Sequence, residues 1–308
     1  MITRFRFVWW LRVVVASFLV ASIADAAIIS YWRFEQDDDP SANGLENPNE
    51  IAGEPAFISS SAKIDATANP GSLPNDIVPG TGLANTASLD GSPLDINGSA
   101  AYSSTLNVSS MTVELWARTE ESTAVVIARS TTSGNNIDNS IADGFRMYDT
   151  QDLKVQYYVD TGGGSQLVTI DTNFRMDTDN SVNGSAEWHH LAFTYDEATG
   201  LGQVWANGSV IGSNDGADNQ AIYWGDISGG DQPQFYAGWQ MDGFDFSKTA
   251  TDNGYIDEIR FSDAALGEDD FLNAPVPEPG TYAVGALLMV GAWICHRRRR
   301  LAVAEESE

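Results

Sequence analysis

The ten residues Glu187-Trp188-His189-His190-Leu191-Ala192-Phe193-Thr194-Tyr195-Asp196 decide the fold class. Their pattern repeats every two residues and not every 3.6, which is typical of a β-strand. A turn over residues 198–200 follows, and after a second short run comes Asn207-Gly208, a strong type I′ hairpin signal. The sequence therefore predicts a hairpin in which residues 189–195 pair with residues 202–205.

The same two-residue period recurs along the chain between clusters of Gly, Asn, Asp and Ser. No window longer than ten residues indicates an amphipathic helix, and residues 35–89 are expected to form long rim loops because they are rich in Asp, Asn, Pro and Gly. Many short strands with Gly-rich turns predict an all-β antiparallel sandwich. The further predicted strands are residues 27–34, 111–118, 124–128, 153–159 and 166–170.

Four segments resemble, in their order along the chain, the laminin-G-like domains of the concanavalin A-like lectin and glucanase superfamily. They are SYWRFE at residues 30–35, LDINGSAAY at 94–102 leading into 111–118, the hairpin at 187–208, and GYIDEIRFS at 254–262. The resemblance implies a concanavalin A-like jelly roll of two stacked antiparallel sheets over residues 27–275. We expect Trp116 and Trp188 to anchor its core. Of His189 and His190, one should face inward in a structural role.

Calcium is the cofactor that the resemblance implies. Related domains often bind it where the first and last strands meet, through a carboxylate that corresponds to Asp257. Glu35 and Asp37, which follow the first predicted strand, are the candidate partners, because calcium prefers several carboxylate and carbonyl oxygens. The alternative is that Asp257 and Glu258 cap the chain or pair with Arg260.

Catalytic motifs are not found in the sequence. Glycoside hydrolysis needs two carboxylates on one wall of a cleft, and the related glucanases carry theirs at alternating positions of one strand. Glu114 stands alone on its predicted strand, and there is no Gly-x-Ser-x-Gly, His-Glu-x-x-His or phosphate-loop motif. The sequence therefore predicts that the chain is not an enzyme, with a glycan-active enzyme as the lesser alternative.

Aromatic residues that stack on sugar rings are the candidates for ligand binding. Tyr223-Trp224 and the run FYAGW at residues 235–239, which ends in Trp239, are dense in aromatics among Gly and Asp. Any single ring is more often part of a core. Trp224 is the preferred exposed candidate, because Gly225-Asp226 follows it and suggests a loop. A polysaccharide or another surface protein is the expected partner.

Both ends of the chain indicate export. Three arginines, an apolar run at residues 13–23 and Ala24-Asp25-Ala26 predict a signal peptide over residues 1–26, which signal peptidase removes after Ala26. Near the other end, Pro277-Glu278-Pro279 precedes an uncharged run at 281–295, four arginines at 297–300 and a polar tail at 302–308.

The order of these last parts, within residues 276–301, resembles the PEP-CTERM sorting signal. The resemblance implies a short membrane helix, inserted transiently, and a cut near Pro277-Glu278-Pro279 by the membrane peptidase exosortase. The product would then lie at the cell surface or in the extracellular matrix. The alternative is an ordinary tail anchor.

Charge and cysteine content narrow the function classes further. The chain has 16 basic and 43 acidic residues and a formal net charge of −27, which repels nucleic acid. Its one cysteine, Cys295, lies in the tail, so a disulfide or a cysteine nucleophile is excluded from residues 27–275. A non-catalytic binding protein is the leading expectation, and a purely structural envelope component is the second.

Overall fold

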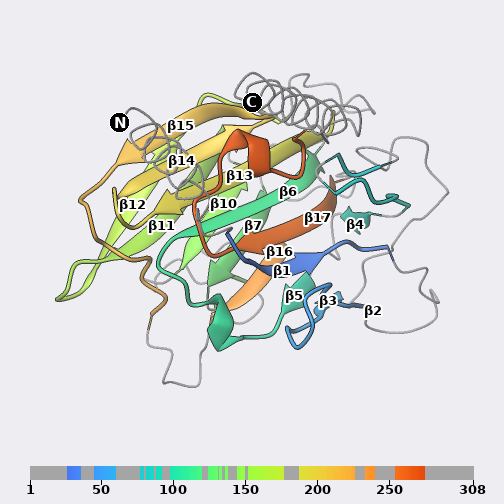
Figure 1. The fold of residues 1–308 in the computed structure, drawn as a ribbon, viewed down its shortest axis with the longest axis horizontal. Helices are drawn as coiled ribbons and strands as arrows, with labels where there is room; N and C mark the ends of the chain where they lie inside the picture. Colours follow the sequence, from blue (N-terminus) through green and yellow to red (C-terminus); the bar gives the residue numbers. More distant parts are fainter. Residues whose placement is uncertain are drawn as a thin grey trace, which may run out of the picture.

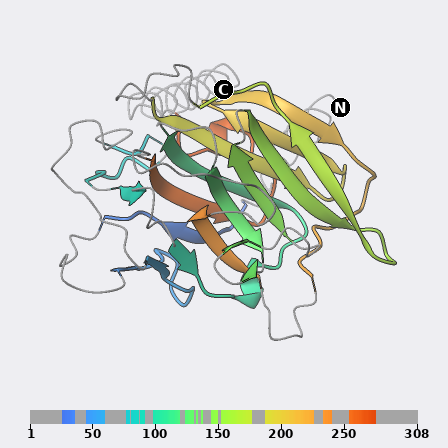
Figure 2. The ribbon, with the colours of Figure 1, turned by 180° about the vertical axis from the view of Figure 1, so that it is seen from behind.

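The structure of the protein is a computed structural model. Its described residues form two antiparallel β-sheets stacked face to face, which Figures 1 and 2 show from opposite sides. Within the described residues, helical structure is confined to the 3-10 turns η1 (Ser104–Leu106) and η2 (Glu268–Asp270), and no helix there is long and apolar enough to cross a membrane. The structure describes residues 26–35, 45–59, 77–79, 81–86, 88–91, 98–119, 124–130, 132–133, 136–137, 144–149, 152–176, 187–225, 233–239 and 254–274.

The first sheet joins the two ends of the domain. Its order is β1-β17-β6-β13-β14-β15, with β4 also paired to β17, so the last strand lies between the first strand and the middle of the chain. Figure 1 shows these strands nearest the viewer. Their bounds are β1 (Ile28–Trp32), β4 (Leu89–Gly91), β6 (Met111–Thr119), β13 (His189–Asp196), β14 (Leu201–Ala206), β15 (Ser209–Asp215) and β17 (Gly254–Ser262).

The second sheet, nearest the viewer in Figure 2, has the order β12-β11-β10-β7-β16-β5-β3-β2. A separate ladder pairs β8 (Thr132–Ser133) with β9 (Asn136–Ile137). The bounds of the second sheet are β2 (Leu45–Asn47), β3 (Phe57–Ser59), β5 (Gly98–Ala100), β7 (Ala124–Ser130), β10 (Phe145–Asp149), β11 (Leu153–Asp160), β12 (Ser165–Asp171) and β16 (Gln234–Trp239).

The predicted all-β sandwich and its central hairpin are confirmed. β13 pairs with β14 as predicted, and in the next turn, between β14 and β15, Asn207 and Gly208 both take the positive φ values, 51° and 80°, that a type I′ turn requires. The expectation of loops only at residues 35–89 is wrong in part, because β2 and β3 lie there and β4 begins at Leu89. Each has three residues, too few to show an alternating pattern.

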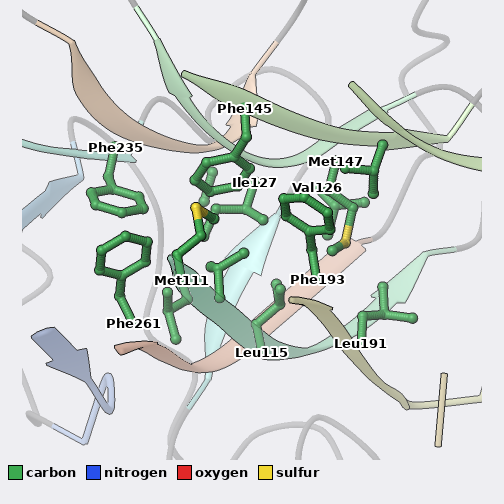
Figure 3. Packing of buried hydrophobic residues seen from close by; sticks show 14 of the residues in the cluster. Met111, Leu115, Val126, Ile127, Phe145, Met147, Leu191, Phe193, Phe235 and Phe261 are labelled. Carbon is green, nitrogen blue, oxygen red and sulfur yellow. The ribbon is translucent and has the colours of Figure 1, made fainter. Parts of the chain in front are cut away.

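The core lies between the two sheets and is rich in phenylalanine. Phe145 of the second sheet packs against Phe193 of the first, and Phe235 against Phe261, with ring centroids 6.2 and 5.2 Å apart. Figure 3 shows these side chains reaching toward one another from opposite layers. Pairs of this kind stabilise the stacking of the sheets beyond their buried area.

Trp116 and Trp188 are not core anchors, and that expectation is wrong. Val113, Leu115 and Ala117 of β6 belong to the core, so alternation directs Trp116 to the outer face of the first sheet. There it is half-buried beside His190, 5.3 Å between ring centroids. Trp188 is also half-buried and lies against Tyr255.

Residues 263–274, which we call the strap, cover part of this outer face. The strap follows β17 and runs in front of β6 and β13 (Figure 1). Thr112 anchors its beginning by donating to the Ala264 carbonyl and accepting from the Leu266 amide, at 2.7 and 2.8 Å. Phe271, near the end of the strap, packs on the rings of His190 and Trp205. The strap therefore buries polar residues that would otherwise face solvent.

Gly144 allows β10 to approach its neighbours closely. Its φ is +59°, and a Cβ placed there would lie 1.8 Å from the backbone carbonyl oxygen of Arg129. Gly162 has a similar φ of +75° but open space around it. We expect Gly144→Ala to lower the free energy of unfolding by about 1–3 kcal/mol more than Gly162→Ala, since the second variant suffers only the backbone strain. Urea denaturation of both variants measures this difference, and equal losses would contradict it.

Candidate cation site at the junction of the first and last strands

A β-bulge in β17 builds the candidate site. Ile256 and Phe261 both belong to the core, although they are five positions apart and strict alternation would place them on opposite faces. The register with β6 shifts between Asp257 and Arg260, and Glu258 takes a φ of 53°. The extra residue lets Asp257 and Glu258 both leave the core side, at the cost of a strained backbone at Glu258.

Asp257 lies at the centre of the site and is fully buried. Its Oδ2 accepts a hydrogen bond of 2.7 Å from Nδ2 of Asn85, while its Oδ1 is buried without a hydrogen-bond partner. Oδ1 of Asn85 is also buried and unpartnered. Burial, and then the charges of Glu258 and Glu35, raise the pKa of Asp257 well above its usual value. Two buried oxygens, one on each of these hydrogen-bonded side chains, thus lack a hydrogen-bond partner.

Glu258 is the second buried carboxylate of the site. Tyr31 of β1 donates its hydroxyl to Oε2, and Arg33 donates Nε to Oε1 at 3.3 Å. Burial nevertheless raises the pKa of Glu258 to about 7, although Tyr31 and Arg33 both act in the opposite direction. The contacts with Tyr31 and Arg33 therefore do not fully offset the cost of burying this carboxylate beside Asp257.

Glu35 lies beside these two carboxylates but has partners of its own. It accepts a hydrogen bond of 3.2 Å from Arg33. It also accepts hydrogen bonds from the backbone amide of Thr86, at 2.9 Å, and from the Thr86 hydroxyl. Together Glu35, Asn85, Asp257 and Glu258 form what we call the carboxylate cluster. Asp37, the other predicted ligand, lies outside the described residues.

The loop over residues 77–86 carries Asn85 and Thr86 to the cluster. Ile77 bridges to Ala84, and the Ala84 carbonyl accepts a hydrogen bond of 2.5 Å from Arg33. The loop exposes Ile77 by 56% and Leu83 by 48%. It is therefore tied to the first and last strands through polar contacts, with two aliphatic side chains toward solvent.

A calcium ion fits the donor set at Asp257 and Asn85, because both unpartnered atoms are oxygens and calcium prefers oxygen ligands. The described residues contain no group of three or more His, Cys, Asp or Glu side chains that could hold a metal ion. Carbonyl groups or water would therefore have to complete the shell around these two oxygens. The same donor set does not suit a soft metal, since it offers neither sulfur nor imidazole.

The aromatic candidates lie elsewhere, and the expected exposure of Trp224 is wrong. Its side chain is 7% exposed, its Nε1 donates to the Val108 carbonyl at 2.8 Å, and the guanidinium of Arg129 lies 4.0 Å from its ring centroid. Tyr223 is half-buried. Trp239 ends β16, and its side chain lies outside the described part of the chain.

Glu114, the lone carboxylate of its strand, is fully buried on the outer face of the first sheet. Its Oε1 accepts from Nε of Arg260 at 2.6 Å. Its Oε2 lies 2.8 Å from Nε2 of His190 and accepts from the Leu272 amide of the strap at 2.7 Å. Every oxygen of this carboxylate is thus occupied, and its contacts are structural. His189, which faces the core, is buried as well, beside Asn207 and Phe174.

Two features define the class of protein: a two-sheet β-sandwich and a buried carboxylate cluster where its first and last strands meet. The Laminin_G_3 family model, described as the concanavalin A-like lectin/glucanases superfamily, matches residues 95–270, which is more than half of the chain. The chain belongs to this family. No curated protein matches it.

Solved structures of similar fold include structures of toxins. The binding domain of Paraclostridial mosquitocidal protein 1 is 12% identical, with a TM-score of 0.50, and the match covers 80% of this chain and 51% of that one. A structure of botulinum neurotoxin type C, whose cell entry is described as dependent upon interaction with two ganglioside molecules, is 14% identical, with a TM-score of 0.49 and coverages of 82% and 51%. The chain thus spans about half the length of these structures, and the likeness shows the fold alone.

Proposed function

We propose that this chain is an exported, non-catalytic binding protein whose jelly-roll domain recognises carbohydrate, with calcium holding the recognition loops in place. Membership of a family of lectins and glucanases supports the ligand class. The single observation that carries the calcium part is the pair of buried, unpartnered oxygens on Asp257 and Asn85. A cation there would fix the loop at 77–86 to the strand junction, because Asn85 belongs to that loop.

A non-catalytic role fits the buried carboxylates of β6 and β17 better than hydrolysis does. A glycosidase needs one carboxyl group that reaches the leaving oxygen and a second on the far side of the sugar. Glu114, Asp257 and Glu258 are all fully buried, and two of the three are tied to arginine. None of them is placed to touch a polysaccharide.

The route to the cell surface is part of the same proposal. Signal peptidase would cut after Ala26, the helix at 281–295 would hold the precursor in the membrane with arginines 297–300 in the cytoplasm, and exosortase would cut near Pro277-Glu278-Pro279. Ala26 is the first described residue, and the other segments lie outside the described ranges. The mature protein would then remain at the cell surface or in the matrix.

The decisive experiment measures binding of the exported protein to a broad panel of polysaccharides, with calcium and then with a chelator. We expect saturable binding that the chelator and Asp257→Asn both weaken. Asp215→Asn, at an exposed end of β15, serves as the matched control and should bind normally. Polysaccharide binding that is unchanged by the chelator would contradict the proposed role of calcium. Lack of binding across the panel, with retention in the matrix, would favour a structural envelope component, and release of sugar products would favour an enzyme.

A further inference from the structure

The first described residues of the chain meet the beginning of the strap. The backbone nitrogen of Ala27 donates a hydrogen bond of 2.8 Å to Oδ1 of Asp263, and the Asp263 amide donates one of 3.1 Å back to the Ala27 carbonyl. Ile28 and Ser262 are partners in the β1–β17 ladder, so this pair continues the ladder by one position. Both residues are exposed.

Ala27 is also the residue at which the mature chain begins if signal peptidase cuts after Ala26. Hydrolysis adds one water across the Ala26–Ala27 peptide bond. The carboxyl group leaves on Ala26, and the amine stays on Ala27, where it takes up a proton because an α-amine is largely protonated at neutral pH. A neutral amide with one N–H becomes an ammonium group with three donors at the same position.

We propose that removal of the leader creates an ion pair between the new α-ammonium group of Ala27 and the carboxylate of Asp263, so that processing itself completes the closure of β1 on β17. The inference rests on the export route proposed above and adds to it a structural role for the new N-terminus. The supporting geometry is already present, since the donor atom lies 2.8 Å from the acceptor oxygen. A charged donor makes such a bond stronger than the neutral amide does.

Exposure limits the strength of this ion pair and makes it dependent on salt. Exposed pairs contribute little to stability, so a large change in melting temperature is not the signature to seek. The chemical reactivity of the amine is a better one. Asp263 stabilises the protonated form of the amine, which does not react with acylating reagents, whereas salt screens the pair and restores the reaction.

The test begins with the exported protein recovered from producing cells, whose N-terminal residue is read by mass spectrometry. The rate at which the Ala27 amine is acylated near neutral pH is then compared between the unsubstituted protein, Asp263→Asn and Asp269→Asn. Asp269 is an exposed acid of the same strap and serves as the matched control. We expect acylation to be about two- to fivefold slower in the unsubstituted protein and in Asp269→Asn than in Asp263→Asn at low salt. That difference should shrink at about 1 M salt.

Three results would overturn the inference. One is a mature N-terminus at a residue other than Ala27. The second is an equal acylation rate in Asp263→Asn, and the third is a slower rate in the unsubstituted protein that salt leaves unchanged, which would indicate shielding without an ion pair. Because none of these readouts involves a glycan or calcium, failure here is distinguishable from failure of the proposed binding function.

Discussion

We expect Glu114→Gln to lower the free energy of unfolding by about 3–5 kcal/mol, because it removes one partner of a buried ion pair and leaves Arg260 without its counter-charge. For a domain of this size the loss corresponds to a melting temperature about 6–20 °C lower. The amide side chain keeps the shape of the carboxylate but can offer only one oxygen. It cannot accept from Arg260 and from the Leu272 amide of the strap at the same time.

The pH dependence of stability provides a second readout for the same variant. Burial alone would raise the pKa of Glu114, but the hydrogen bond with His190, the charges of Arg260 and His190, and the Leu272 amide together hold it below its usual value of 4.5. A carboxylate with a lowered folded-state pKa stabilises the protein above its unfolded-state pKa, and this contribution is lost as the pH falls through the folded-state pKa. Stability should therefore decline more steeply with acid in the unsubstituted protein than in Glu114→Gln.

Denaturant unfolding of both proteins across the acid range tests these expectations. Glu50→Gln provides the control, since Glu50 is exposed and its side chain has no recorded partner among the described residues. It should cost less than about 0.5 kcal/mol. If Glu114→Gln proves as mild as Glu50→Gln, or if its acid sensitivity matches that of the unsubstituted protein, the buried network does not hold the strap in the way we describe.

Calcium should stabilise the domain by about 2.7 kcal/mol when its concentration is a hundred times its dissociation constant, a gain set by mass action. The melting temperature should rise by about 5–10 °C. Asp257→Asn should abolish the gain, because it removes the only negative ligand that we place at the site. The same variant should be more stable than the unsubstituted protein in chelator, since it removes a buried charge whose Oδ1 has no hydrogen-bond partner.

Thermal unfolding with calcium, with magnesium and with chelator measures these effects. Asp215→Asn is again the control and should respond to calcium as the unsubstituted protein does. Magnesium should stabilise less at the same concentration, because it demands a tighter octahedral shell than two fixed oxygens and flexible partners provide. If calcium raised the melting temperature of Asp257→Asn equally, the ion would bind elsewhere. If calcium left the melting temperature of the unsubstituted protein unchanged, the proposed calcium site would be wrong.

The sequence predicted the hairpin of β13 and β14 well, because its turn residues and its alternation are local signals. Gly200, in the turn between β13 and β14, takes a positive φ of 68°, and Asn207 and Gly208 take positive φ values in the next turn, between β14 and β15. Trp116 shows where local signals end. Alternation places Trp116 on the opposite face of β6 from Val113 and Leu115. That outer face is partly buried because the strap, more than a hundred residues later in the sequence, covers it.

The candidate site was predictable only in part, for the same reason. Asp257 was found through a motif, whereas Asn85 lies 172 residues away in a loop without strand pattern, and nothing nearby marks it. The β-bulge at Glu258 could have been found, because core positions Ile256 and Phe261 are out of phase. Trp224 was misjudged because Gly225 does indicate a loop, but that loop packs its indole against Arg129 and the Val108 carbonyl.

The position of β17 in the first sheet has a consequence for the synthesis of this chain. β17 lies between β1 and β6 in the sheet, and it is the last of the described strands to be synthesised. A polypeptide that stops before residue 254 would present β1 and β6 with unpaired edges facing each other, a template for pairing with other chains. Loop closure between such distant strands is slow. Ribosomal stalling or proteolytic cleavage before residue 254 would therefore yield aggregation-prone chains and not a smaller domain, whereas a cut after residue 274 leaves β17 in place.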